Sequence, residues 1–126
     1  MYRSFKIALA MVLVMPIHLS AALAEGSLEQ GEKVFKRCAA CHAATDQNKT
    51  GPGLAGIVGR TAGKAADYNY SPGLASSTLV WDEKTLDSFL QGPRKLVPGT
   101  KMTLSVPKPD ERQSVILYLK SLAAGN

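Results

Sequence analysis

The chain has few of the residues that build most metal and catalytic sites. Its 126 residues include only two cysteines, two histidines and one tryptophan, and aromatic residues make up 6% of the total. No segment alternates apolar and polar residues over the length of a strand, which argues against a β-sheet domain. Internal repeats and low-complexity tracts are absent from the sequence. We therefore expect an all-α fold with long loops.

Dense runs of one charge are also missing. Lys and Arg number 15 against 10 Asp and Glu, which gives a net charge of +5. A nucleic-acid-binding domain usually shows longer basic runs and a larger excess of positive charge, so we expect no nucleic-acid partner. A mildly cationic protein is better suited to docking on an acidic surface.

The first 24 residues are apolar but short of a comfortable membrane span. Two basic residues open this segment, residues 7–17 form its apolar stretch, and small residues end it at Ala24. A spanning helix needs about 20 apolar residues. We therefore predict a cleaved signal peptide over residues 1–24 and a single domain over residues 25–126 in the periplasm. An uncleaved membrane anchor is the alternative.

Removal of residues 1–24 would leave 102 of the 126 residues, which suits a single core. Two of the 15 basic residues would be lost and all 10 acidic residues kept, so the net charge would fall to +3. His42 and Met102 would remain as the only histidine and the only methionine.

One short segment, Cys38-Ala39-Ala40-Cys41-His42, indicates a specific chemistry. Two thiols three positions apart can form thioethers with the vinyl groups of a porphyrin, and the adjacent imidazole can bind its iron. The segment predicts one haem c per chain, attached through Cys38 and Cys41, with His42 as an axial ligand.

Three other sites use similar residues. A thioredoxin-like dithiol normally follows a strand, and no strand pattern precedes Cys38. A structural zinc site needs four ligands, whereas the exported chain offers three soft ones. A disulfide between Cys38 and Cys41 would suit an oxidising compartment but would leave His42 without a role.

Met102 is the candidate for a second iron ligand. It lies in the turn-rich segment Pro98-Gly99-Thr100-Lys101-Met102, away from any helical stripe that would need a core methionine. If the iron has two protein ligands of the usual kinds, His42 and Met102 are the pair that remains. This pairing raises the reduction potential of a haem.

The helical signals lie mainly at the two ends of the exported chain. Ser27-Leu28-Glu29-Gln30 has the form of a capping box, in which the Gln30 side chain reaches back to the backbone of Ser27. A first helix should run from Leu28 to the cysteine motif. The residues expected on its apolar face are Leu28, Val34, Phe35 and Cys38.

A last helix should begin near Pro109, whose fixed φ suits a first turn. Its apolar stripe comprises Val115, Ile116, Leu119 and Leu122. A shorter helix is predicted over residues 82–91, with Leu86, Phe89 and Leu90 facing inward. Residues 50–53 and 56–73 are rich in Gly, Pro and small polar residues and are predicted to form loops.

Together these features resemble the class I cytochromes c, in particular the branch of mitochondrial cytochrome c and bacterial cytochrome c2. Besides the cysteine motif and residues 98–102, the similarity is carried by Gly31, Phe35, Thr50-Gly51-Pro52, Gly59-Arg60, Tyr68-Asn69-Tyr70, Trp81, Pro93-Arg94-Lys95 and Tyr118-Leu119-Lys120. The resemblance covers nearly all of residues 27–123. It implies that the terminal helices cross while short middle helices and long loops wrap around one haem.

The resemblance also implies roles for residues around the haem. The carbonyl of Pro52 would accept a hydrogen bond from His42, which would fix the tautomer of the ligand. A buried haem propionate needs hydrogen-bond donors or a cation. The residues expected around it are Tyr70, Trp81, Arg60 and Thr100.

The chain departs from the family pattern near the expected methionine ligand. Phe89 stands where the mitochondrial branch has a tyrosine, Leu74 where it has an asparagine, and Leu104 where it has an aromatic residue. The changes at Phe89 and Leu74 remove polar groups from the site, and both expected iron ligands stay in place.

We expect a soluble one-electron carrier that is not an enzyme, because two protein ligands leave no open position at the iron. Its implied partners are acidic faces of redox proteins, such as a cytochrome bc1-type complex and a terminal oxidase or reaction centre. The expected docking rim comprises Arg37, Lys49, Arg94, Lys95, Lys101 and Lys108. We expect a monomer without stable membrane insertion after cleavage. A small haem peroxidase and a fixed subunit of a larger complex are the alternatives.

Overall fold

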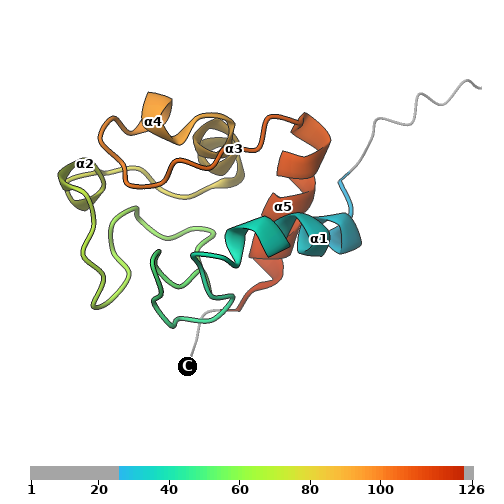
Figure 1. Ribbon diagram of the computed structural model, residues 1–126, viewed down its shortest axis with the longest axis horizontal. Coiled ribbons are helices and arrows are strands. Elements are labelled where there is room, and N and C mark those ends of the chain that lie inside the picture. Colours follow the sequence, from blue (N-terminus) through green and yellow to red (C-terminus); the bar gives the residue numbers. More distant parts are fainter. Residues whose placement is uncertain (1–25, 124–126) are drawn as a thin grey trace, which may run out of the picture.

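The computed structural model describes residues 26–123 as five helices joined by long loops (Figure 1). This range contains no β-strand, only an isolated antiparallel bridge between Thr61 and Val80. The predicted all-α fold is therefore confirmed. Among the described helices, none has the length and apolar character needed to cross a membrane. The predicted signal peptide over residues 1–24 lies outside the described residues.

Helix α1 (Leu28–Cys38) begins at the predicted cap, where the Ser27 side chain accepts a hydrogen bond from the Gln30 amide at 3.1 Å. The other half of the predicted capping box is wrong. The backbone amide of Ser27 donates to Ser114 Oγ at 3.2 Å. The side-chain Nε2 of Gln30 donates to the Asp110 carboxylate at 3.3 Å. Gln30 therefore bonds to the neighbouring helix α5, because tertiary packing brings polar partners within its reach.

The buried face of α1 is narrower than predicted. Val34 and Phe35 are buried, whereas Leu28 is 53% exposed and lies at the first turn, beyond the cover of other elements. Leu28 has the spacing of the apolar face, but it is the first residue of the helix and lies outside the core.

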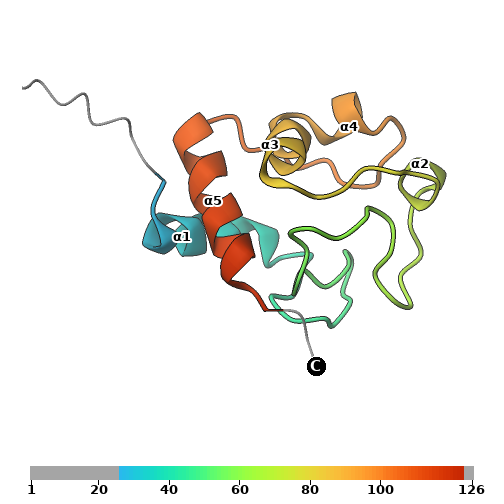
Figure 2. The ribbon, with the colours of Figure 1, turned by 180° about the vertical axis from the view of Figure 1, so that it is seen from behind.

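Helix α5 (Pro109–Ser121) crosses α1 at close range on one side of the molecule (Figures 1 and 2). A Cβ atom on Gly31 would overlap the carbonyl oxygen of Ser114, so the contact requires glycine. Next to it, the rings of Phe35 and Tyr118 pack with centroids 4.9 Å apart. Three residues of the predicted stripe, Val115, Ile116 and Leu119, are buried, and Leu122 follows the helix and is partly buried.

Helix α3 (Glu83–Gln91) agrees with the predicted element. Asp82 caps it by accepting from the Thr85 amide at 2.7 Å, and Leu86, Phe89 and Leu90 are buried. Two shorter helices, α2 (Pro72–Ala75) and α4 (Pro93–Leu96), each begin at a proline, as suits a first helical turn. Helix α2 begins within the stretch that we predicted to be a loop, since a single turn leaves no periodic pattern to detect.

The core lies where α1, α3 and α5 meet, and the loops add to it. Ile57, Ala62, Val97 and Val106 are buried loop residues that pack with the helical core. The loops between α1 and α3 lie on the side away from the α1–α5 crossing (Figure 2).

Candidate functional site

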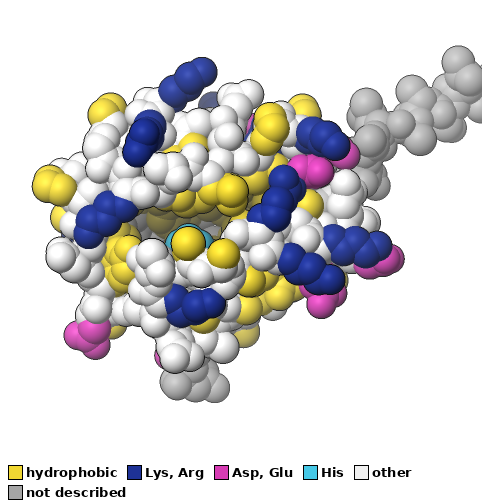
Figure 3. All heavy atoms as spheres, in the orientation of Figure 1, with side chains coloured by type: hydrophobic (Ala, Val, Ile, Leu, Met, Phe, Trp, Pro, Cys, Tyr) yellow, Lys and Arg dark blue, Asp and Glu magenta, His cyan; other side chains and the backbone are white. Residues whose placement is uncertain are grey.

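A cavity of about 470 Å³ opens between α1, α3, α5 and the loops. The space-filling view shows it as a hollow with apolar walls and the histidine at its centre (Figure 3). Pockets that bury a sizeable ligand typically have volumes of about 300–1,000 Å³ and mostly apolar walls. The cavity therefore has the size and polarity of a site for a large apolar group.

The end of α1 brings the cysteine motif to this cavity. The amides of Cys41 and His42 both donate to the Cys38 carbonyl, at 3.0 and 2.9 Å, and this tight turn directs both thiols and the imidazole toward one wall. Burial raises the pKa of the Cys38 thiol. No disulfide joins Cys38 and Cys41 in this structure, and no cluster of three metal-ligating side chains occurs within residues 26–123.

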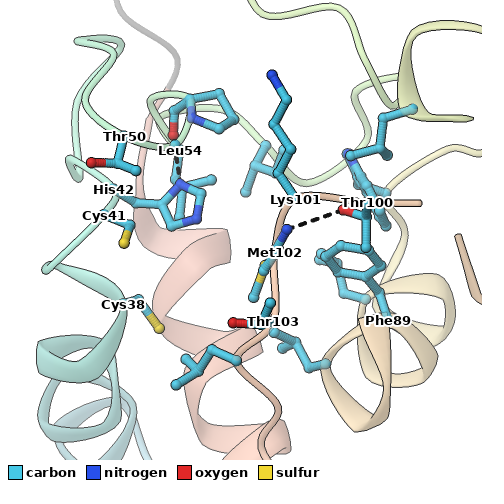
Figure 4. A pocket seen from close by; sticks show the side chains of 18 of the residues that line it. Cys38, Cys41, His42, Thr50, Leu54, Phe89, Thr100, Lys101, Met102 and Thr103 are labelled. Carbon is cyan, nitrogen blue, oxygen red and sulfur yellow. Dashed lines mark hydrogen bonds between the residues drawn. The ribbon is translucent and has the colours of Figure 1, made fainter. Parts of the chain in front are cut away.

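His42 is held in a defined orientation. Its Nδ1 lies 2.7 Å from the carbonyl oxygen of Pro52 (Figure 4). A carbonyl can only accept, so Nδ1 carries the proton and Nε2 keeps its lone pair. Burial lowers the pKa of His42, and the bond to Pro52 opposes this shift. The ring is thus kept neutral and able to bind a metal through Nε2.

Gly51 lies directly against the His42 ring. A Cβ atom at this position would come within 2.5 Å of Cε1 and 2.7 Å of Nδ1. Even the smallest side chain would push the ring out of place. This role of Gly51 could not be predicted from the sequence, because a steric requirement of this kind leaves no chemical signature there.

Met102 enters the same cavity from a different segment of the chain (Figure 4). Its amide lies 3.4 Å from Oγ1 of Thr100, which is 3% exposed. Next to it, Lys101 Nζ donates to the Asn69 carbonyl at 2.7 Å and ties this segment to the opposite loop. The structure therefore brings together a neutral imidazole and a thioether that are 60 positions apart in the sequence.

The structure places most of the other predicted site residues in the cavity wall. Tyr70, Trp81 and Thr100 all line it. The Tyr70 hydroxyl accepts from the Ala65 amide at 3.1 Å, and the Trp81 and Phe89 rings lie 4.8 Å apart.

Arg60 is not part of the cavity wall. Its guanidinium donates to the carbonyls of Gly53 and Ala55, at 3.2 and 3.3 Å, and so supports the loop that follows Pro52. Arg60 therefore contacts the backbone of this loop and does not line the cavity.

Tyr68 and Lys49 support the site through contacts that the sequence did not predict. The Tyr68 hydroxyl donates to the Thr50 carbonyl at 2.7 Å, and burial raises the pKa of this phenol. Lys49 Nζ donates to the Ala39 carbonyl at 2.6 Å and closes the loop around the cysteine motif. Tyr68 was identifiable only as one member of a Tyr-Asn-Tyr motif, and the Lys49 contact depends entirely on the folded loop.

The residues of this cavity fit a covalently attached haem. The wall is apolar, the two cysteines and an oriented imidazole lie on one side, and the thioether of Met102 also lines the space. Tyr, Trp and Thr side chains supply polar groups suited to carboxylate substituents of a porphyrin.

Comparison with known proteins agrees with this chemistry. The family model for cytochrome c matches residues 28–123. Cytochrome c2 of Agrobacterium tumefaciens (strain II Chrys) is 48% identical over 101 residues, covering 75% of this chain and 91% of the relative. Cytochrome c2 of Rhodomicrobium vannielii is 40% identical over 116 residues, covering 90% of this chain and 93% of the relative.

A solved structure is also similar. Cytochrome cH from Methylobacterium extorquens has a TM-score of 0.73 and 42% sequence identity. The match covers 76% of this chain and 99% of that one. The similarity therefore extends to the arrangement of the helices as well as to the sequence.

The close contact at Gly51 can be tested with one methyl group. We expect Gly51→Ala to lower the free energy of unfolding of the haem-bound protein by about 1–3 kcal/mol, the usual cost of overpacking, because the new Cβ displaces His42. Denaturant unfolding measures this change. The control is Thr50→Ala at the exposed neighbouring position. Equal stability of the two variants would show that the His42 ring tolerates the added methyl.

Proposed function

The chain belongs to the cytochrome c family and is a haem electron carrier, and we propose that it moves single electrons through a haem held by His42 and Met102. The observation that carries this proposal is the convergence of these two side chains in one apolar cavity. The chain has one haem c, covalently bound, and the cysteines of its Cys-x-x-Cys-His motif lie in the wall of this cavity.

Each residue has a distinct task in this proposal. Cys38 and Cys41 hold the haem as thioethers, His42 and Met102 bind the iron, and the Pro52 carbonyl keeps the imidazole in the tautomer that binds metal. When bound, the haem supplies an iron that changes between the ferrous and ferric states. Tyr70, Trp81 and Thr100 are proposed to serve a buried propionate, and Arg60 is proposed to support the loop next to them.

The cavity wall favours the reduced state. Phe89 and Leu74 present apolar side chains where a polar group would stabilise the additional charge of ferric iron. A thioether ligand acts in the same direction. We therefore propose that this chain has a reduction potential in the upper part of the range available to haem proteins.

The alternative function is that of a haem enzyme such as a small peroxidase. An enzyme of this type needs an open coordination position at the iron, and a bound Met102 would fill it. The distinction can be made by spectroscopy. The purified ferric protein should be six-coordinate and low-spin, and the reduced protein should bind carbon monoxide slowly; a five-coordinate resting state would favour the enzyme.

Removal of the thioether should change both the potential and the reactivity. We expect Met102→Ala to lower the reduction potential by on the order of 100 mV, within the roughly 0.8 V range that axial ligands span, and to increase peroxidase activity. Potentiometric titration and a peroxide assay measure the two effects. Thr103→Ala, at the next position in the cavity wall, is the matched control. An unchanged potential in Met102→Ala would remove Met102 from the ligand set.

The surface around the cavity carries the charge for docking. Lys and Arg side chains surround the opening, and most Asp and Glu side chains in this view lie toward the periphery (Figure 3). Within the predicted rim, Arg37 and Lys108 share Glu111, at 2.6 and 3.8 Å, which offsets part of their charge. Arg94 and Lys95 on α4 are exposed and have no acidic partner within residues 26–123. We propose that these two residues are the main contacts for an acidic redox partner.

Electron transfer to an acidic partner should slow as salt increases, because charges are screened beyond about 10 Å at 0.1 M ionic strength. Lys95→Gln should lower the second-order rate at low salt several-fold. Stopped-flow kinetics over a salt series measures this rate. The control is Lys84→Gln, which also removes one exposed positive charge. Lys84 lies on α3 beside a separate hollow between α3 and α5, away from the proposed docking surface. Equal effects of the two variants would assign the steering to net charge alone.

We propose that the protein acts in the periplasm after loss of residues 1–24, as a free carrier between redox complexes. The cytochrome c2 relatives support the carrier function. Expression of the full chain in a Gram-negative host should yield an exported protein that begins at Glu25 and carries one haem. Intact-mass measurement reads both properties at once, and a product that retains residues 1–24 would indicate a membrane anchor.

A further inference from the structure

The segment that carries Met102 is attached unevenly on its two sides. We call residues 102–108 the Met102 strap; it contains no helix or strand and leads from the cavity to α5. Before the strap, Lys101 bonds to Asn69 and Thr100 is buried. After Met102, residues 103–105 are exposed and form no hydrogen bond to another described residue. The first attachment point after Met102 is therefore Val106.

Val106 is attached to two helices. Its side chain is 1% exposed, and its amide donates to the Leu90 carbonyl of α3 at 2.7 Å. On the other side, Arg112 of α5 donates through Nη1 to the carbonyls of Val106 and Pro107, at 3.0 and 2.8 Å. Two consecutive carbonyls of the strap are thus held by one guanidinium.

Arg112 is itself fixed in place. Its side chain is 6% exposed, and its Nε donates to Asp87 of α3 at 2.7 Å. A guanidinium stays charged at all ordinary pH values and presents its donors in a rigid planar fork. Burial of such a charge is costly unless its donors are paired, so Arg112 strongly favours the arrangement in which the strap carbonyls lie beside it.

We propose that Arg112 is a positioning residue that keeps the Met102 thioether in the cavity by holding the strap at Val106 and Pro107. This inference rests on the proposed binding of iron by Met102. Without Arg112, the carbonyls of Val106 and Pro107 lose their hydrogen bonds to α5. The weakly held part of the strap can then lengthen from residues 103–105 to the start of α5 at Pro109. The hydrogen bond from the Val106 amide to the Leu90 carbonyl and the buried Val106 side chain remain, so release of Met102 is more frequent but not complete.

Binding of imidazole to the ferric protein reports this release directly. Imidazole can reach the iron only after Met102 has left. Its apparent affinity is therefore the intrinsic affinity multiplied by the fraction of molecules in which Met102 is released. We expect Arg112→Gln to increase the apparent imidazole affinity of the haem-bound protein about tenfold, which is the scale of one charge-assisted hydrogen bond. Titration far below the denaturant midpoint keeps the protein folded.

A matched control separates this effect from general loss of stability. Lys120→Gln removes another ion pair between α5 and α3, that of Lys120 with Glu83, without touching the strap. Its imidazole affinity should equal that of the unmodified protein. If Arg112→Gln lowers the unfolding midpoint but leaves the imidazole affinity unchanged, Arg112 is only structural and the proposal is wrong.

A second variant covers the case in which Arg112→Gln does not fold. Arg112→Lys keeps the charge but cannot reach Asp87 and both strap carbonyls together, so it should give an intermediate increase in imidazole affinity. Met102→Ala sets the upper limit of that affinity. If the unmodified protein already binds imidazole as tightly as Met102→Ala does, Met102 is not a ligand, and the proposed ligation fails before the role of Arg112 is reached.

Discussion

The close crossing of α1 and α5 is the contact on which the site depends. It needs a glycine at position 31, because a side chain there would enter the backbone of α5, and it is reinforced by the Phe35–Tyr118 pair. Since α1 ends at Cys38, the crossing fixes where both thiols and His42 lie. The same helix α5 holds the Met102 strap through Arg112. One helix therefore sets the positions of both segments that supply iron ligands.

The loops of this protein are ordered by specific polar contacts around an apolar space. Lys49, Tyr68, Arg60 and Lys101 each donate to a backbone carbonyl of a loop near the cavity. Each contact satisfies one loop carbonyl and joins two segments that surround the cavity. A large apolar cofactor in the cavity would give these loops further apolar surface to pack against.

The sequence predicted the longer helices well because their signals are local. Asp82, Pro109 and the apolar period fix where α3 and α5 begin and which face is buried. Predictions that needed a partner from elsewhere were less successful. Gln30 bonds to α5 instead of its own cap, and Leu28 is exposed. Each outcome depends on which segment packs beside the residue, and sequence spacing does not contain that information.

By itself, the sequence determined the chemical groups: two thiols and an imidazole within five residues, and a single methionine within residues 25–126. It also lacked the alternation of apolar and polar residues that a β-strand needs. These are fixed by covalent order and local preference. Only the tertiary structure decided which groups meet. Met102 reaches the cavity of His42 because the loop before it bonds to Asn69 and the strap after it is held by α3 and α5. Contacts between residues so far apart in the chain form only when the whole domain packs.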